Sequence, residues 1–171
     1  MTRELQEKLE SYQRVWAEVD LDAIWENMVH MKENIAEKTK ILAVIKTDGY
    51  GHGGVPIAKM LEQLDFMFGY AAATYEEAHV LREAGVKKPI LILGYTFPYC
   101  YEELIREEIR PAVYRRDTVE ELVAAAAKVG QKAKVHIKVD TGMGRIGITP
   151  DEEGLEFVRF LSLIHISEPT R

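Results

Sequence analysis

The sequence predicts an α/β protein with a parallel sheet, and three observations lead to that fold class. Short apolar runs rich in β-branched and aromatic residues alternate with segments of helical spacing. These runs are nearly continuous in hydrophobicity, which is typical of parallel strands whose two faces are both covered. They recur every ~20–25 residues, the length of one βα unit in a doubly wound sheet or a (β/α)8 barrel. The pattern alone leaves these two architectures open.

Five strands are expected, with helices connecting them. The expected strands cover residues 41–45, 66–71, 90–93, 111–114 and 135–139. Five βα units are too few to close an eight-stranded barrel, so a barrel built from them would be incomplete. In both architectures ligands bind at the carboxyl ends of the strands, which is where Lys46 and the segment 140–147 fall.

Short sequence signals mark where the expected helices begin and end. An opening helix is expected because five apolar residues fall on one helical face: Leu21, Ile24, Met28, Met31 and Ile35. Three later helices have start signals, and the first two also have a glycine at their end. These are Thr74 with Glu77 before a helix ending near Gly85, Asp117 with Glu120 before one stopping at Gly130, and Thr149-Pro150 with Glu152.

Composition excludes several classes of protein and partner. The 171 residues suit one domain, and a net charge of −6 argues against nonspecific nucleic-acid binding. The sequence has no apolar run of about 18 residues, and its charged N-terminus lacks the apolar core of a secretory signal. The single cysteine, Cys100, excludes an internal disulfide, and the five histidines show no metal-binding spacing. We therefore expect a cytoplasmic protein without a metal site.

The last eleven residues are treated apart from the rest. Residues 161–171, LSLIHISEPTR, resemble the translation of an adapter sequence used in preparing sequencing libraries. We expect residues 1–160 to be a natural domain that is truncated near residue 160, and residues 161–171 to be a non-native tail, so His165 carries no functional argument. The alternative is the end of an amphipathic helix that runs into a polar tail.

The first candidate site is ILAVIKTDGYGHGG, residues 41–54, where a lysine ends an apolar strand and a glycine-rich loop follows. A lysine whose charged form is disfavoured by apolar surroundings can attack an aldehyde to form a Schiff base. A lysine at the end of a strand more often extends into solvent. Four glycines in six residues, however, suit a backbone that closely approaches a phosphate. Tyr50 and His52 lie in the same loop and can contribute hydrogen-bonding groups.

The second candidate site is VHIKVDTGMGRIG, residues 135–147. The two-residue period of a strand places His136, Lys138 and Asp140 on one face. Three polar side chains on one face of a covered strand are unfavourable unless they have partners or line a wet cavity. Arg145 stands in the glycine-rich loop that follows, and its planar guanidinium suits a carboxylate or a phenolate oxygen. We therefore favour a functional interpretation over a solvated strand face.

Together these two segments resemble the signature segments of bacterial alanine racemases. WAEVDLDAI (16–24) and PILILG (89–94) resemble that family's opening and third-strand segments, and the similarity runs from about residue 16 to about residue 160. The resemblance implies an N-terminal (β/α)8 TIM-type barrel that binds pyridoxal 5′-phosphate (PLP). It also implies a homodimer and a C-terminal β domain that this chain does not include.

The resemblance also implies roles for individual residues. Lys46 resembles the lysine that holds PLP covalently and acts as the base on the D-alanine side. Tyr50 resembles the tyrosine that hydrogen-bonds the PLP phosphate, and Leu93 resembles a leucine packed near the cofactor ring. Arg145 resembles the arginine that contacts the PLP phenolic oxygen and the substrate carboxylate. Lys138 resembles a lysine that is carbamylated in some members, where the new anion could hold Arg145.

The activity implied is interconversion of L- and D-alanine for peptidoglycan synthesis. The family's second base is a tyrosine from the C-terminal domain of the other subunit, so we expect this chain alone to be inactive. Two alternatives stay open on the sequence. One is a serine or broad-specificity amino-acid racemase of the same fold, and the other is a noncatalytic PLP-binding barrel protein.

Overall fold

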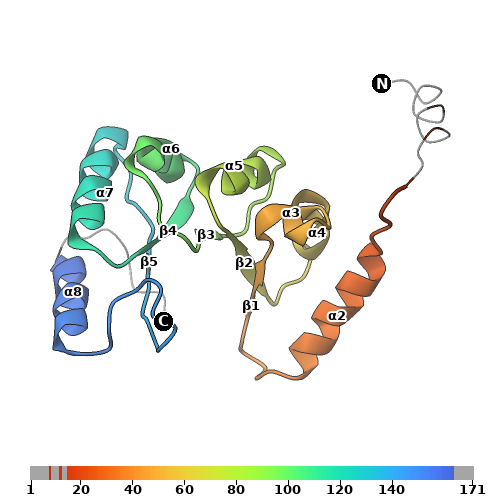
Figure 1. Ribbon diagram of the computed structural model, residues 1–171, viewed down its shortest axis with the longest axis horizontal. Coiled ribbons are helices and arrows are strands. Elements are labelled where there is room, and N and C mark those ends of the chain that lie inside the picture. The colour runs from red at the N-terminus through yellow and green to blue at the C-terminus, as the bar shows by residue number, and fades with distance from the viewer. Residues whose placement is uncertain (1–7, 9–11, 13–14, 164–171) are drawn as a thin grey trace.

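The computed structural model describes residues 8, 12 and 15–163, and its five strands form one parallel sheet (Figure 1). The strands lie in chain order, β1-β2-β3-β4-β5, and each pairs in parallel with the next. They are β1 (Ile41–Val44), β2 (Met67–Ala72), β3 (Ile90–Ile92), β4 (Ile109–Val113) and β5 (His136–Ile137). This sequential order is that of a barrel, and an incomplete one, because a barrel of this type needs eight strands.

Helical segments follow every strand, and one helix precedes β1. They are α2 (Leu21–Glu33), α3 (Lys46–Tyr50), α4 (Gly54–Leu61), α5 (Tyr75–Glu83), η1 (Pro98–Cys100), α6 (Tyr101–Arg106), α7 (Arg116–Val129) and α8 (Glu152–Leu163). Most of the charged N-terminal segment and residues 164–171 lie outside the described residues. The predicted domain boundary at residue 160 falls inside α8, where Leu161 is buried. The adapter origin of residues 161–171 stays a prediction.

The expected helix at Thr74 is confirmed, whereas the other two predicted N-caps are wrong. The Thr74 side chain accepts a hydrogen bond from the Glu77 N–H and caps α5. Before α7 the cap position is occupied by Arg115, and the Asp117 carboxylate instead binds Arg115 and the Thr118 N–H. Asp117 is therefore the second residue of α7 rather than the residue before it.

The last helix begins two residues later than Pro150, which was expected at its first position. Asp151 replaces Thr149 as the capping residue, because its carboxylate accepts from the Gly154 N–H at 3.0 Å. The Thr149 hydroxyl donates to the other oxygen of the same carboxylate at 2.6 Å. The aspartate is the stronger acceptor, and the threonine supports it.

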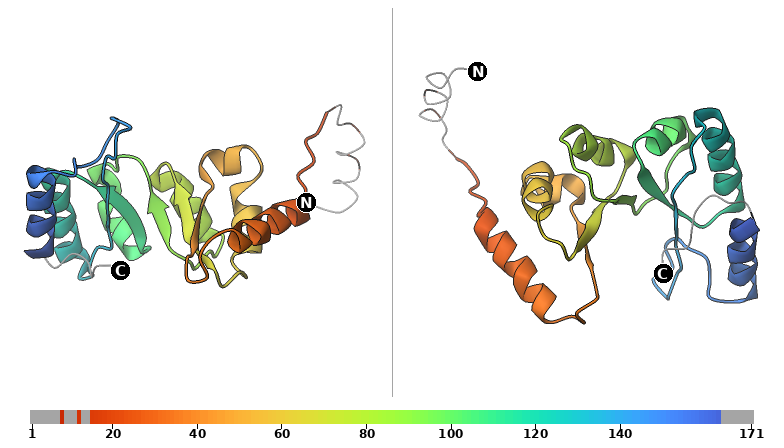
Figure 2. Two further views of the ribbon diagram at one scale, coloured as in Figure 1. Left: turned by 90° about the horizontal axis from the view of Figure 1, so that it is seen from below. Right: turned by 180° about the vertical axis from the view of Figure 1, so that it is seen from behind.

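Helices cover only one face of the sheet, so the expectation that both faces are covered is wrong for this chain. α4, α5, α6 and α7 follow one another along the same side of the strands, with α2 and α8 at the two ends (Figures 1 and 2). The core lies between these helices and the sheet. Tyr70, Ile90, Ile92 and Val113 are each fully buried there, and the Tyr70 hydroxyl donates to the Ala58 carbonyl at 2.7 Å.

The opposite face of the sheet is the barrel's inner face, and it is partly polar. Arg110 stacks over the Phe68 ring at 5.6 Å, and His136 meets the same ring edge-on at 6.4 Å. Burial and the charge of Arg110 lower the pKa of His136. His136 and Lys138 are half-buried, whereas Ile137 is exposed. The predicted alternation is seen between His136 and Ile137, but β5 covers only these two residues and is shorter than the predicted strand 135–139.

No helix among the described residues is long and apolar enough to cross a membrane.

Candidate functional site

The loop after β1 is a left-handed turn that places Lys46. Thr47, Asp48, Gly49 and Tyr50 all have φ between +51° and +61°. Left-handed backbone costs about 1–2 kcal/mol for each residue that carries a Cβ, and three of these four do. Strain of this kind persists only where neighbouring groups hold it, and it is concentrated at functional sites. This turn therefore needs identifiable supports.

Three hydrogen bonds and one close packing contact supply that support. The Gly49 N–H donates to the Ile45 carbonyl at 2.8 Å, which closes the turn on the end of β1. The Asp48 carboxylate accepts from the Gly54 N–H at 2.7 Å, and the Glu77 carboxylate accepts from the Thr47 N–H at 2.9 Å. A Cβ on Gly49 would lie 3.1 Å from the Ile57 side chain, so glycine also fits the space.

Lys46 is half-buried at the carboxyl end of β1, directly before the strained residues. Its ammonium lies 5.9 Å from the centre of the Tyr50 ring. Within the part of the chain that is described, neither the Lys46 ammonium nor the Tyr50 hydroxyl has a hydrogen-bond or ion-pair partner. An amine and a phenol placed together and free of protein partners fit a ligand that carries both an aldehyde and a phosphate.

Leu93 follows β3 at the same end of the sheet. Its N–H donates to the Ala72 carbonyl at 2.9 Å, which extends the pairing of β2 with β3 by one residue. Alternation from Leu91, which shares a register with Arg110 on the inner face, also places Leu93 on that face. The half-buried Leu93 therefore lies where a ligand at the mouth of the barrel could contact it.

The loop after β5 is closed at its base, and its tip carries Arg145. The Asp140 N–H donates to the Ile148 carbonyl and the Ile148 N–H to the Lys138 carbonyl, each at 2.8 Å. The Asp140 carboxylate accepts from the N–H groups of Gly142 and Gly144, which lowers its pKa. Arg145 is exposed, and its guanidinium has no hydrogen-bond or ion-pair partner within the described chain.

The two candidate sites share one end of the sheet but not one pocket. Lys46 follows β1 and Arg145 follows β5, the two outer strands of the five. Lys138 directly follows β5, where its N–H donates to the Val113 carbonyl at 2.9 Å, and no contact joins its side chain to Arg145 in the described chain. In a closed barrel of eight sequential strands β1 and β5 would lie on opposite sides, with both sites at the carboxyl end.

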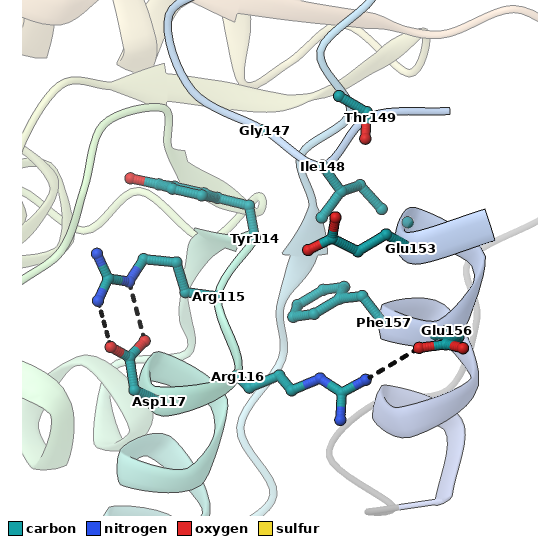
Figure 3. A pocket seen from close by; sticks show the side chains of 11 residues that line it. Tyr114, Arg115, Arg116, Asp117, Gly147, Ile148, Thr149, Glu153, Glu156 and Phe157 are labelled. Atoms are coloured by element: carbon teal, nitrogen blue, oxygen red, sulfur yellow. Dashed lines mark hydrogen bonds and ion pairs between the residues drawn. The ribbon is translucent and has the colours of Figure 1, made fainter. Parts of the chain in front are cut away.

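A cavity of about 800 Å³ lies away from the predicted residues (Figure 3). Its walls come from the segment after β4, the end of the loop after β5 and one face of α8. Arg115 binds Asp117 and Arg116 pairs with Glu156 at 3.9 Å, so both cations on its rim already have anionic partners. Gly147, the last residue of the second candidate segment, lines this cavity, whereas Lys46, Tyr50, Leu93, Lys138 and Arg145 do not.

The sequence did not predict that Asp48 and Glu77 support the Lys46 turn. Asp48 lies within the glycine-rich segment, where only the glycines, Tyr50 and His52 were expected to have a functional role. Glu77 was expected to complete a capping box, and its carboxylate instead binds the Thr47 and Ala73 N–H groups. The signal that could have found Glu77 is its place in the first turn after β2, beside the end of β1.

Comparison with known proteins identifies the family. The family described as "Alanine racemase, N-terminal domain" matches residues 19–167. Alanine racemase from Clostridium perfringens is 49% identical over 144 residues, which are 84% of this chain and 37% of that protein. The structure of Clostridium difficile 630 alanine racemase in complex with cycloserine matches with a TM-score of 0.87 and 38% identity, covering 91% of this chain and 42% of that one.

A relative with a different named substrate also matches. Histidine racemase from Leuconostoc mesenteroides superposes with a TM-score of 0.76 and 27% identity, covering 86% of this chain and 39% of that one. The chain thus spans about two-fifths of the length of these relatives. Together with the parallel strand order and the lysine at the end of β1, these matches show that the chain belongs to the alanine racemase family and forms part of its N-terminal barrel domain.

Proposed function

We propose that the complete protein containing this chain interconverts L- and D-alanine with PLP as cofactor. The observation that carries the proposal is the placement of Lys46, a half-buried amine held at the carboxyl end of β1 by a strained turn. Membership of the alanine racemase family supports it. When bound, PLP supplies an electron sink that stabilises the carbanion formed as the substrate loses its α-proton.

Lys46 would hold the cofactor covalently and, once displaced by the substrate amine, would move the proton on one face of the α-carbon. An amine free of protein partners can do both once it has lost a proton, because it has no hydrogen bond or ion pair to the described chain that must first be broken. Tyr50 lies beside Lys46, and its hydroxyl would donate a hydrogen bond to the phosphate. Leu93 would pack near the cofactor ring. These three residues follow β1 and β3, at the end of the sheet where barrel enzymes bind their ligands.

Arg145 would bind the substrate carboxylate and the cofactor's phenolic oxygen. A guanidinium suits this role because it stays charged and presents its donors in a fixed plane. Lys138 lies seven residues before it, directly after β5, and its carbamate would supply an anion able to hold the Arg145 guanidinium. The Asp140 carboxylate keeps the intervening loop folded through its bonds to Gly142 and Gly144.

Racemisation also needs a base on the opposite face of the α-carbon. We propose that a residue outside this chain supplies it, from the C-terminal domain of a second copy in a homodimer. The chain alone should then bind the cofactor weakly and turn over no substrate. The proposed role in the cell is supply of D-alanine for peptidoglycan.

Racemase activity is tested with the complete protein, expressed from the gene that encodes this chain and loaded with PLP. L-alanine is incubated with it in deuterium oxide, and chiral chromatography follows D-alanine while mass spectrometry follows deuterium at the α-carbon. We expect both to appear, and Lys46→Ala to slow them by about 10²–10⁴-fold, the usual contribution of a general base. PLP binding without turnover would instead support a noncatalytic carrier.

A second candidate substrate is favoured by one comparison. The match to a histidine racemase shows that proteins with this barrel and different named substrates exist. The same assay with L-serine and L-histidine therefore discriminates among substrates. Faster turnover of either than of alanine would refute alanine specificity and support a serine or broad-specificity racemase.

A further inference from the structure

The ladder between β1 and β2 stops at a point where two backbone N–H groups lose their partners. The Ile45 N–H donates to the Ala71 carbonyl at 2.9 Å. Continued parallel pairing would have the Ala73 N–H donate to the Ile45 carbonyl. That carbonyl instead accepts from Gly49, because the chain turns left-handed at Thr47. The N–H groups of Ala73 and Thr47 are therefore both left without a strand partner.

One carboxylate binds both of these N–H groups. Glu77 Oε1 accepts from the Thr47 N–H at 2.9 Å, and Glu77 Oε2 accepts from the Ala73 N–H at 2.8 Å. Glu77 lies in the first turn of α5, where the Thr74 cap fixes its backbone and the helix end favours a negative charge. Its side chain thus replaces the missing ladder bonds and joins the ends of the two strands.

We propose that Glu77 is a positioning residue that fixes the Lys46 amine by holding this junction. The proposal rests on the proposed function of Lys46. Thr47 directly follows Lys46 in the chain. The bond from its N–H to Glu77 therefore fixes the backbone next to the reacting lysine from a different element, α5. A carboxylate suits the junction because both of its oxygens accept, whereas a glutamine would turn an NH₂ group toward one of the two N–H donors.

The test compares Glu77→Gln with Glu76→Gln in the complete protein. Glu77→Gln keeps the size and shape of the side chain, but its NH₂ group would face the N–H donor of either Thr47 or Ala73. Glu76 is the matched control, because it precedes Glu77 on α5 and its carboxylate binds Tyr99 rather than the Lys46 turn. Hydrogen exchange at the Thr47 and Ala73 amides is measured in PLP-free protein, and kcat and KM for alanine are measured with PLP bound.

We expect Glu77→Gln to lower kcat by about 10- to 100-fold with KM changed less than threefold, the pattern of a misplaced reacting group. Exchange at the two amides should become at least about tenfold faster, with amides in β3 and β4 unchanged. Glu76→Gln should leave all of these within about twofold.

Three results would overturn the role of Glu77. The first is that Glu77→Gln shows the same kcat and the same amide exchange rates as Glu76→Gln. The second is that Glu77→Gln lowers kcat without faster exchange at the Thr47 and Ala73 amides. The third is that Glu77→Gln speeds amide exchange throughout the protein. Failure of the proposed function is recognised separately, because either the wild-type protein would then show no turnover or Lys46→Ala would retain it, whereas the exchange rates of the Thr47 and Ala73 amides report on the junction in both cases.

Discussion

The carboxylate of Asp48 accepts a hydrogen bond from the N–H of Gly54 at 2.7 Å. Asp48 lies within the left-handed turn, and Gly54 is the first residue of α4. The bond therefore joins the strained segment beside Lys46 to the start of the next helix, where unpaired N–H groups need an acceptor. Asp48 also stays in place through its own carbonyl, which accepts from Gly53 at 2.9 Å.

Removing this carboxylate should loosen the turn. Asp48→Ala is expected to lower the free energy of unfolding by about 1–2 kcal/mol, the usual effect of losing a helix cap. Asp48→Asn is the matched control, because its amide oxygen can still accept from Gly54 and should keep most of that stability. Denaturant unfolding of the complete protein measures both variants. Equal loss in the two variants would show that the charge, rather than the hydrogen bond, holds the turn.

Gly147 is predicted to tolerate no side chain. Its φ is +135°, and a Cβ would lie 2.6 Å from the Asp140 nitrogen and 2.9 Å from the Val139 carbonyl carbon, both of them backbone atoms. Gly147→Ala should destabilise the protein by about 2–3 kcal/mol, because the base of the Arg145 loop must open. Gly144→Ala, at φ +67° with nothing near its Cβ, should cost only about 1 kcal/mol. Denaturant unfolding compares the two; a smaller loss for Gly147→Ala would contradict the loop geometry.

Acid should loosen the Arg145 loop through Asp140. The N–H groups of Gly144 and Gly142 lower the pKa of this carboxyl below its ordinary value of 3.8. A lowered pKa means that the stabilisation is present above pH 3.8 and is lost as the pH falls through the folded-state value. Amide exchange at Gly142 and Gly144, corrected for intrinsic rates, should therefore rise below pH 3.8, and in Asp140→Ala it should already be fast at pH 6. Protection that survives in Asp140→Ala would contradict this assignment.

Cys100 should be an unreactive thiol in the folded protein. Burial raises its pKa from 9.0 to about 11, and its Sγ donates to the Phe97 carbonyl at 3.2 Å. At pH 8 this shift reduces the thiolate fraction by about 100-fold, and the thiolate is the reactive form. Labelling by a thiol reagent should thus be at least about 100 times slower in native than in urea-unfolded protein. Cys100 is the chain's single cysteine, so the labelled peptide is easily assigned. Similar labelling rates in native and urea-unfolded protein would show that the Cys100 thiol is accessible in the folded state.

Sequence periodicity predicted the strands because burial against the helices dictates them. Tyr70, Ile90 and Val113 are fully buried, and such positions leave little choice of residue type. Strand ends were less predictable. Arg110 belongs to β4 although the expected strand began at residue 111, because its side chain lies on the polar inner face rather than in the apolar core.

The sequence pointed to Lys46 and Tyr50 as candidate site residues, but it did not point to the residues that support their turn. Lys46 and Tyr50 stand out in the sequence because they lie in a glycine-rich loop directly after an apolar strand. Glu77 is 30 residues from Thr47 and meets it only when β1 and β2 pair. The left-handed run through Thr47 and Asp48 was also hidden, because neither residue type requires that conformation.

The most direct test of the account concerns the Lys46 amine itself. The complete protein, loaded with PLP, is reduced with borohydride, digested and mapped by mass spectrometry. We predict that the pyridoxyl label lies on Lys46 and that Lys46→Ala gives no labelled peptide. A label on a different lysine of the wild-type protein, such as Lys138, would contradict the central claim.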